Sequence, residues 1–194
     1  MPEKNRKPVF LVGRMVNLRP FSKEDIPTLT CWINDPDIRE FGFPPLPQTE
    51  KQEEGWFNNL GADDKNVFLA IETKDGTLIG SIGINRIDWK DRTATTGALI
   101  GDKEYWGKGY GTDAKMILLD YAFNALNLRK ICSSVVASNK RSMRYNLRCG
   151  YKVEGVRKRH KFTNGRYRDF IEFGIFKADW LPIWKRYKRT GKVR

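Results

Sequence analysis

A cluster of glycines between residues 105 and 112 offers the clearest chemistry in the sequence. The segment YWGKGYGT places Gly107, Gly109 and Gly111 at alternate positions, between a predicted strand and a predicted helix. Glycine allows positive φ angles and lets another group approach the backbone amides closely. Successive exposed amides at the start of a helix form an anion-binding concavity, to which Lys108 would add a point charge. The segment therefore predicts a site for a pyrophosphate.

Two common phosphate-binding motifs do not fit this segment. A Walker loop requires GxxxxGK followed by Ser or Thr, but Gly101 and Gly107 are one residue too far apart and Gly109 follows Lys108. A dinucleotide fingerprint requires GxGxxG, and Thr112 stands where its third glycine belongs. An ordinary flexible turn between a strand and a helix can have the same glycine spacing. The spacing alone therefore leaves the kind of ligand open.

The elements that would hold these glycines follow from hydrophobic patterning and capping signals. Strands are predicted at residues 14–21, 67–72, 78–88, 94–100, 130–137, 151–162 and 167–177. Helices are predicted at 23–34, 49–60, 112–127 and 139–148, followed by a helical C-terminal segment around Trp180 and Trp184. Residues 41–47 (FGFPPLP) are predicted to form a rigid loop. Together these elements predict an α+β fold with a mixed, mainly antiparallel sheet and flanking helices.

The length and composition fit one domain with a compact core. The chain has 194 residues, of which 40% are hydrophobic and 12% aromatic. We expect an N-terminal extension at 1–12, one domain at 13–184 and a basic C-terminal tail at 185–194. No apolar run approaches the roughly 20 residues that span a bilayer, and the N-terminus shows no secretory signal.

The cysteine and histidine content bears on location and on metal binding. The three cysteines form no CxxC pair, and their odd number favours reduced thiols; they are Cys31, Cys132 and Cys149. With the absence of a membrane span, this predicts a cytoplasmic protein. The single histidine, His160, excludes a His-rich metal site, so no metal is expected.

The chain is strongly basic, with 36 Lys and Arg against 23 Asp and Glu and a net charge of +13. Such a field attracts phosphate-bearing ligands and repels polycations. Much of the charge lies in the C-terminal third, at residues 157–161 and 185–194. Two interpretations stay open: a solvated face with a loose tail, or a docking surface for RNA or a ribosome-associated substrate.

Two motifs together carry a family resemblance. The string YWGKGYGT resembles motif A of the GNAT acetyltransferases, in particular their RimJ/RimL branch. The string from Asn139 to Ser142 (NKRS), followed by Cys149, Gly150 and Tyr151, resembles motif B of the same branch. The segments RMVNLRPFSKED and NGRYRDF fit the same pattern, so the resemblance covers about residues 14–180. It implies the GNAT fold, whose sheet is splayed at its centre.

The resemblance implies acetyl-CoA as the cosubstrate. Its pantetheine arm would lie between the splayed strands, and the glycine segment would hold its pyrophosphate. Ser142 is the implied catalytic residue, because its hydroxyl would donate a proton or a hydrogen bond to the departing thiolate. The implied cofactor-binding residues are Leu99, Ile100, Gly101, Trp106, Gly107, Lys108, Gly109, Tyr110, Gly111, Thr112, Asn139, Ser142 and Tyr145.

The sequence departs from the family pattern at both acid–base positions. Thr95 stands where many GNAT enzymes carry a glutamate base, and Asn146 stands where many carry a tyrosine acid. Tyr145 comes one residue early, which turns it by about 100° around a helix. Trp106 holds the place of the Arg or Gln that usually begins motif A. The general base is therefore unidentified, and the side chains considered for it are Glu72, Glu104, Glu172 and His160.

An amine must be neutral to attack a thioester, and this requirement bears on the acceptor. At pH 7, deprotonation costs an α-amine about 1 kcal/mol and a lysine about 4.6 kcal/mol. A site without an evident base therefore favours the N-terminal α-amine of a protein, as RimJ/RimL relatives modify on ribosomal proteins. Two alternatives stay open. One is a non-catalytic, acyl-CoA-sensing or RNA-associated module, and the other is an acetyltransferase of a small-molecule amine; a polyamine would be repelled by the net charge. Both a monomer and a homodimer are compatible with the sequence.

Overall fold

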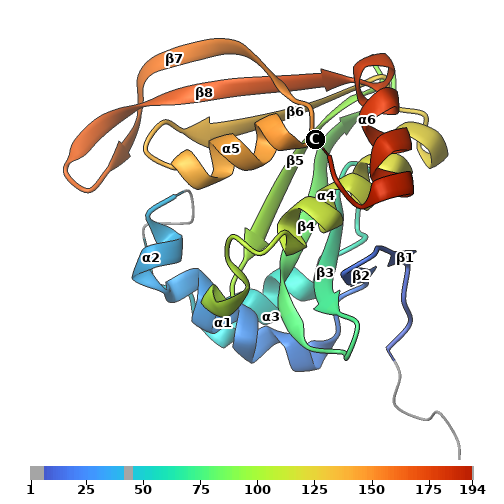
Figure 1. Cartoon of the computed structure of the whole chain (residues 1–194). Helices are drawn as coiled ribbons and strands as arrows, with labels where there is room; N and C mark the ends of the chain where they lie inside the picture. The colour runs from blue at the N-terminus through green and yellow to red at the C-terminus, as the bar shows by residue number, and fades with distance from the viewer. Residues whose placement is uncertain (1–6, 42–45, 194) are drawn as a thin grey trace, which may run out of the picture.

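A computed structural model of the chain describes residues 7–41 and 46–193. Within these ranges eight strands form one sheet in the order β1-β2-β3-β4-β5-β6-β8-β7 (Figure 1). The strands are β1 (Leu11–Val12), β2 (Val16–Arg19), β3 (Val67–Thr73), β4 (Leu78–Asp88), β5 (Thr93–Ile100), β6 (Lys130–Val136), β7 (Lys152–Thr163) and β8 (Arg166–Phe176). Neighbouring strands are antiparallel except β5 and β6, which are parallel. The predicted α+β class with a mainly antiparallel sheet is confirmed.

Helices cover the sheet and connect its strands. They are η1 (Lys23–Asp25), α1 (Ile26–Asn34), α2 (Pro36–Arg39), α3 (Glu50–Asn58), η2 (Lys103–Tyr105), α4 (Tyr110–Asp120), the π-helical turn η3 (Tyr121–Ala125), α5 (Lys140–Arg148) and α6 (Lys177–Thr190). Helix α4 packs against β1, β2, β4 and β5 and contacts α5, while α1 packs against α3. In the described part of the chain, none of the helices combines the length and the apolar character needed to cross a membrane.

Several predicted boundaries change in the structure. The helix expected to begin at Thr112 begins at Tyr110, because Gly109 takes a positive φ of 98° and serves as its N-cap. The helix expected to stop before Pro36 is followed at once by α2, since proline suits a first helical turn and the Asp35 side chain accepts a hydrogen bond from the Asp37 amide. Residues 42–45 of the predicted rigid loop lie outside the described residues.

The C-terminal segment differs from the expected basic tail. Helix α6 continues to Thr190, and its aromatic side chains reach the core. Trp180 and Trp184 stack with ring centroids 5.3 Å apart, and Tyr187 stacks on Trp184 at 6.0 Å. These rings anchor residues 185–190 as part of the folded unit, because aromatic side chains dominate the apolar area that a helix buries.

Asp113 fixes the position of α4. Its buried carboxylate accepts hydrogen bonds from the backbone amides of Met15 (2.6 Å) and Val16 (2.9 Å), and from the Tyr187 hydroxyl. One side chain thereby ties α4 to the start of β2 and to α6. The N-terminus of α4 is consequently held in a defined place above the sheet.

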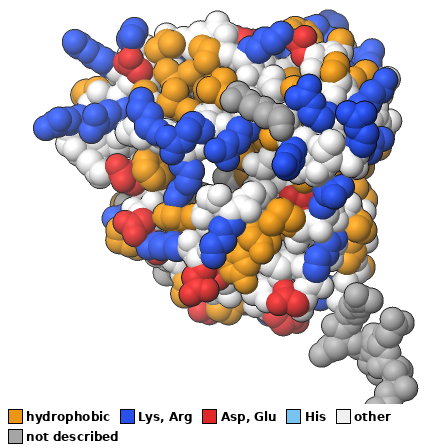
Figure 2. Space-filling model, viewed as in Figure 1, with side chains coloured by type: hydrophobic (Ala, Val, Ile, Leu, Met, Phe, Trp, Pro, Cys, Tyr) orange, Lys and Arg blue, Asp and Glu red, His pale blue; other side chains and the backbone are white. Residues whose placement is uncertain are grey.

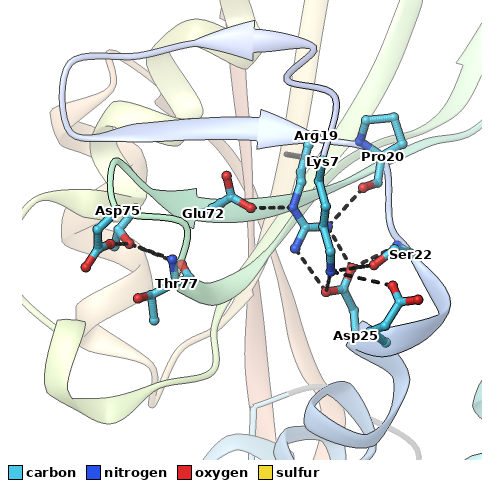
Figure 3. A network of polar contacts seen from close by, with 10 residues as sticks. Lys7, Arg19, Pro20, Ser22, Asp25, Glu72, Asp75 and Thr77 are labelled. Carbon is cyan, nitrogen blue, oxygen red and sulfur yellow. Dashed lines mark hydrogen bonds and ion pairs between the residues drawn. The ribbon is translucent and has the colours of Figure 1, made fainter. Parts of the chain in front are cut away.

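A second buried ionic network lies at the other end of β2. Arg19 is 1% exposed and donates to Asp25 at 2.7 and 2.9 Å and to Glu72 at 2.5 Å (Figure 3). Lys7 also donates to Asp25, at 3.1 Å. Because Glu72 is committed to Arg19, it serves this network and does not fit the role of general base that the sequence left open.

Candidate active site

The sheet is splayed between its two parallel strands. β5 and β6 pair only through residues 93–95 and 130–132, with Thr95 opposite Cys132 at the last pair. Beyond this point β5 continues to pair with β4 alone, and β6 with β8 alone. Figure 1 shows the two strands diverging from this point. The separation opens a cavity of about 410 Å³, a size typical of small-molecule sites.

Four segments line the cavity. These are β5 at residues 96–100, β6 at residues 133–135, the loop and first turn at residues 105–112, and α5 with its N-cap at residues 139–148, together with Ile38, Phe41 and Lys115. The edge of β5 beyond Thr95 has no partner strand and faces the cavity, and at its end the Ile100 carbonyl accepts a hydrogen bond from the Trp106 indole at 2.6 Å. Such an edge can pair with an extended ligand as it would with another strand.

The glycine segment forms the N-terminal end of α4, as predicted. Gly107 and Gly109 adopt φ angles of 75° and 98°, which disfavour any residue with a Cβ. Gly111 lies close to Ile100 and the Tyr145 ring, since a Cβ there would be in ordinary contact with them at 3.6 and 3.7 Å. The first amides of a helix have no intrahelical acceptor, and together with the helix dipole they favour an anion. The geometry therefore fits a diphosphate at this end of the cavity.

Most of the residues predicted to bind the cofactor come together in the cavity wall. These are Leu99, Ile100, Trp106, Gly107, Gly109, Gly111, Thr112, Asn139, Ser142 and Tyr145. Three others do not line it. Gly101 packs against the Trp32 ring, Lys108 is exposed, and the Tyr110 ring packs edge-on against Tyr105. Lys108 can therefore act on an anion only from the rim.

The motif B residues also have a structural role. The Asn139 side chain accepts a hydrogen bond from the Ser142 amide at 2.9 Å and caps α5. Both residues line the cavity as well. The role of Ser142 in proton donation stays a prediction.

Asn146 and Tyr145 both reach the cavity although they are adjacent on α5. The Asn146 amide donates to the Ser142 carbonyl at 3.0 Å, so its side chain is held against its own helix. The Tyr145 hydroxyl is buried without a hydrogen-bond partner among the described residues. Burial raises the pKa of Tyr145 well above its usual value of 10. Tyr145 thus lines the cavity, although it stands one residue before the position of the family acid.

Lys115 is a site residue that sequence reasoning missed. It lies on α4, is 1% exposed, and lines the cavity. Its Nζ donates to Thr96 Oγ1 at 2.6 Å and lies 5.3 and 5.2 Å from the ring centroids of Tyr145 and Tyr151. Burial lowers the pKa of Lys115 from 10.5 to about 8. The available signal was a single lysine within the apolar helical run at residues 114–119.

Three arginines of α5 were also missed. Arg141, Arg144 and Arg148 line the cavity, and their spacing of three and four residues places them on one face of the helix. The Arg141 guanidinium lies 3.6 Å from the centroid of the Trp106 ring, and partial burial lowers its pKa. Guanidinium groups suit phosphate because they present several donors in a plane.

The remaining side chains considered as a base do not enter the cavity. His160 is exposed and 3.1 Å from Arg157, and Glu104 is also exposed. Glu172 accepts from Arg157 and, at 2.6 Å, from Ser134, which does line the cavity. Within residues 7–41 and 46–193, the cavity wall contains no Asp or Glu. The same residues contain no cluster of His, Cys, Asp and Glu able to hold a metal ion.

Comparison with known proteins identifies the class of protein. The family model described as "Acetyltransferase (GNAT) domain" matches residues 15–152, and the chain belongs to this family. Spermidine N(1)-acetyltransferase of Escherichia coli (strain K12) is 29% identical over 180 residues, covering 90% of this chain and 93% of that protein. YdaF of Bacillus subtilis (strain 168), named as a candidate ribosomal N-acetyltransferase, is 32% identical over 106 residues, covering 55% and 57%.

A solved structure supports the same assignment. Spermidine N-acetyltransferase from Vibrio cholerae, in complex with CoA and spermine, matches with a TM-score of 0.80 and 26% identity, covering 86% of this chain and 98% of that one. The chain is thus an N-acetyltransferase with the GNAT fold, and the predicted fold and enzyme class are confirmed. The RimJ/RimL branch stays a prediction, because spermidine acetyltransferases are among the relatives.

Proposed function

We propose that the protein transfers an acetyl group from acetyl-CoA to the N-terminal α-amine of a protein, of the ribosomal-protein type. The observation that carries the choice of acceptor is the charge of the cavity wall. The wall contains four cationic side chains, those of Lys115, Arg141, Arg144 and Arg148. Among the described residues that line the cavity there is no Asp or Glu. This wall suits a cosubstrate with phosphates and an acceptor with a single amine.

Three carboxylates near the cavity are already paired with basic side chains. On the side of α2, Asp35 and Asp37 both accept from Lys103, at 2.8 and 2.6 Å. On the side of β8, Glu172 is paired with Arg157. A polyamine carries several positive charges, and each needs a compensating group when it leaves water. An α-amine that reacts in its neutral form makes no such demand, and it is neutral at a cost of only about 1 kcal/mol at pH 7.

The cosubstrate would bind along the cavity from the glycine segment inward. The amides between Trp106 and Thr112 would hold the diphosphate, and the arginines of α5 would add positive charge beside it. The edge of β5 that faces the cavity beyond Thr95 would pair with the amides of the pantetheine arm. Positioning of the two reactants supplies much of the rate of such a transfer, because a bound pair reacts as a unimolecular system.

Basic side chains also gather outside the cavity. Figure 2 shows Lys and Arg side chains over the upper half of the face, where Figure 1 places α5 and the β7–β8 hairpin. The hairpin exposes Phe162 and Tyr167, with relative exposures of 62% and 66%. Basic and aromatic side chains together suit a nucleic-acid-associated acceptor. This surface supports a ribosome-associated substrate as part of the proposal.

A small-molecule amine is the second candidate, favoured by the spermidine acetyltransferases among the relatives. The test compares three acceptors by release of free CoA thiol: a lysine-free peptide with a free N-terminus, a lysine-containing peptide with a blocked N-terminus, and spermidine. We expect kcat/KM for the free N-terminus to exceed both others at least tenfold. A higher value for spermidine would overturn the choice of acceptor, and CoA binding without turnover on any amine would identify an acyl-CoA-sensing module instead.

A further inference from the structure

We propose that Lys115 donates the proton that the CoA thiolate takes up as it leaves, a role that the family pattern gives to a tyrosine at the position of Asn146. The inference rests on the acetyl transfer proposed above and assigns one residue of that site. It is carried by the placement of the Lys115 amine, by the absence of a counter-ion beside it and by the chemistry of the leaving group.

Lys115 lies where the splayed strands meet. Its hydrogen-bond partner Thr96 is the first residue of β5 beyond the last pair with β6, and both side chains line the cavity. The diphosphate site lies at the other end, next to Ile100 and the start of α4. From Ile100 to Thr96 the strand covers about 13 Å. An arm that enters at the glycine segment and follows β5 therefore brings its sulfur end toward Lys115.

Among residues 7–41 and 46–193, no negative group lies beside the Lys115 ammonium. The groups that face it are Thr96 from β5, Tyr145 from α5, and Cys149 and Tyr151 from the segment that follows α5. Burial raises the pKa of Cys149 to about 12 and raises the pKa values of both tyrosines, so all three are neutral near pH 7. The other charged group of α5 near this end is Arg148, which is also positive. A thiolate formed in the cavity would be the first anion that Lys115 meets.

The proton affinities of donor and acceptor match. Burial lowers the pKa of Lys115 to about 8, while a cysteine thiol, the comparable group in proteins, has a pKa of about 8.5. Proton transfer is most effective between groups of similar pKa near the working pH. At pH 7 most Lys115 side chains are protonated and able to donate, whereas an ordinary lysine would hold its proton about two orders of magnitude more tightly.

The reaction balances with this donor. The neutral acceptor nitrogen attacks the carbonyl carbon, a C–N bond forms, and the C–S bond breaks with its electron pair on sulfur. Lys115 transfers one proton from Nζ to sulfur, which leaves free CoA thiol and a neutral lysine. The acetylated nitrogen releases its extra proton to water, and Lys115 regains a proton from water. The products are the acetylated amine and CoA.

The experiment compares Lys115→Met with Ser142→Ala and Tyr145→Phe, which remove the two hydroxyl groups of α5 that line the cavity. Turnover is measured from pH 6.5 to 9.5 with the most active acceptor, and CoA affinity by calorimetry. We expect the wild-type rate to rise as the acceptor amine deprotonates and to fall above about pH 8 as Lys115 loses its proton. Lys115→Met should lower kcat at pH 7 by about 100-fold or more, abolish the alkaline fall, and change CoA affinity less than threefold.

Two further variants keep the result decisive. Lys185→Met, at an exposed position of α6, serves as a matched control and should retain the wild-type rate and profile. Lys115→Arg keeps the charge but cannot release its proton in this pH range, so it should bind CoA, turn over slowly and show no alkaline fall. A wild-type rate and profile in either Lys115 variant would overturn the inference. A wild-type protein that turns over no acceptor would instead contradict the proposed function.

Discussion

Two buried cations of this protein have opposite surroundings. Arg19 and Lys115 are each 1% exposed. Arg19 is held by two carboxylates, Asp25 and Glu72, whereas Lys115 is held by a hydroxyl and two aromatic rings. Burial acts against both charges, but the hydrogen bonds to Asp25 and Glu72 outweigh it and raise the pKa of Arg19. Nothing outweighs it at Lys115, and the pKa of Lys115 falls to about 8.

The difference follows the position of each residue relative to the cavity. Arg19 joins β2, β3 and η1 and does not line the cavity, so its charge is useful only when paired within the protein. Lys115 lines the cavity beside Thr96, where β5 and β6 separate, and a carboxylate there would raise the pKa of Lys115 and hold its proton. A buried charge without a partner is expensive for folding. Its presence in a cavity wall indicates a role in chemistry, and the paired charge indicates a role in stability.

The largest effect on stability is expected at the paired cation. Arg19→Met leaves Asp25 and Glu72 buried without their main partner, and breaking a buried pair on one side costs about 3–5 kcal/mol. Urea unfolding at pH 7 measures this loss. Arg186→Met, at an exposed position of α6, is the matched control and should change the free energy of unfolding by less than about 0.5 kcal/mol. A loss below about 1 kcal/mol for Arg19→Met would mean that the network contributes little.

The part of the candidate site that acts through backbone groups, the glycine segment, was predicted from the sequence. The glycines between Trp106 and Thr112 act through positive φ angles and free amides, which depend on residue type and spacing alone. The order of strands and helices was predictable for the same reason, since periodicity and capping residues act locally. The predicted helix at 139–148 matches α5 except that Asn139 is its N-cap.

The burial and the partners of the two cationic side chains could not be predicted from local sequence patterns. Lys115 stands in an apolar helical run, and only the packing of α4 over the splayed strands shows that its amine meets Thr96 and two aromatic rings. Arg19 lies in an alternating strand where a polar residue is expected to face solvent, and its partner Glu72 is 53 positions away. Both depend on contacts that are distant in sequence, which no local pattern specifies.

At the unpaired cation, removal of the charge should stabilise the fold. The pKa of Lys115 is about 8 in the folded protein and 10.5 ordinarily, so the unfolded chain binds more protons between these values. Wild-type stability should therefore rise with pH through this window, by about 3 kcal/mol in total because one pKa unit corresponds to about 1.4 kcal/mol. Lys115→Met has no ionisable group at this position and therefore lacks this pH-dependent change in stability. Its free energy of unfolding should exceed the wild-type value by up to about 3 kcal/mol at pH 7, and the advantage should shrink toward pH 10. An equal difference at both pH values would argue against an uncompensated charge.

The smallest of the three effects is the acid response of the paired network. Burial by itself would raise the pKa of Asp25, but hydrogen bonds from Arg19, the Ser22 amide and Lys7 outweigh it and lower the pKa from 3.8 to about 2. Because the folded pKa lies below the unfolded one, this contribution to stability is present above about pH 4 and is lost as the pH falls toward 2. Its size is about 2 kcal/mol.

The variant Asp25→Asn separates the contribution of Asp25 to acid sensitivity from the general effect of acid on the protein. The variant should be less stable than the wild type at pH 6 and should lose less of its remaining stability between pH 4 and pH 2, as measured by urea unfolding at each pH. Asp120→Asn, at a partly exposed position of α4 outside the network, should follow the wild-type pH dependence. If Asp25→Asn and the wild type lose stability in parallel over this range, Asp25 does not keep its charge through Arg19. The contrast between a paired and an unpaired buried cation would then have to rest on Glu72 alone.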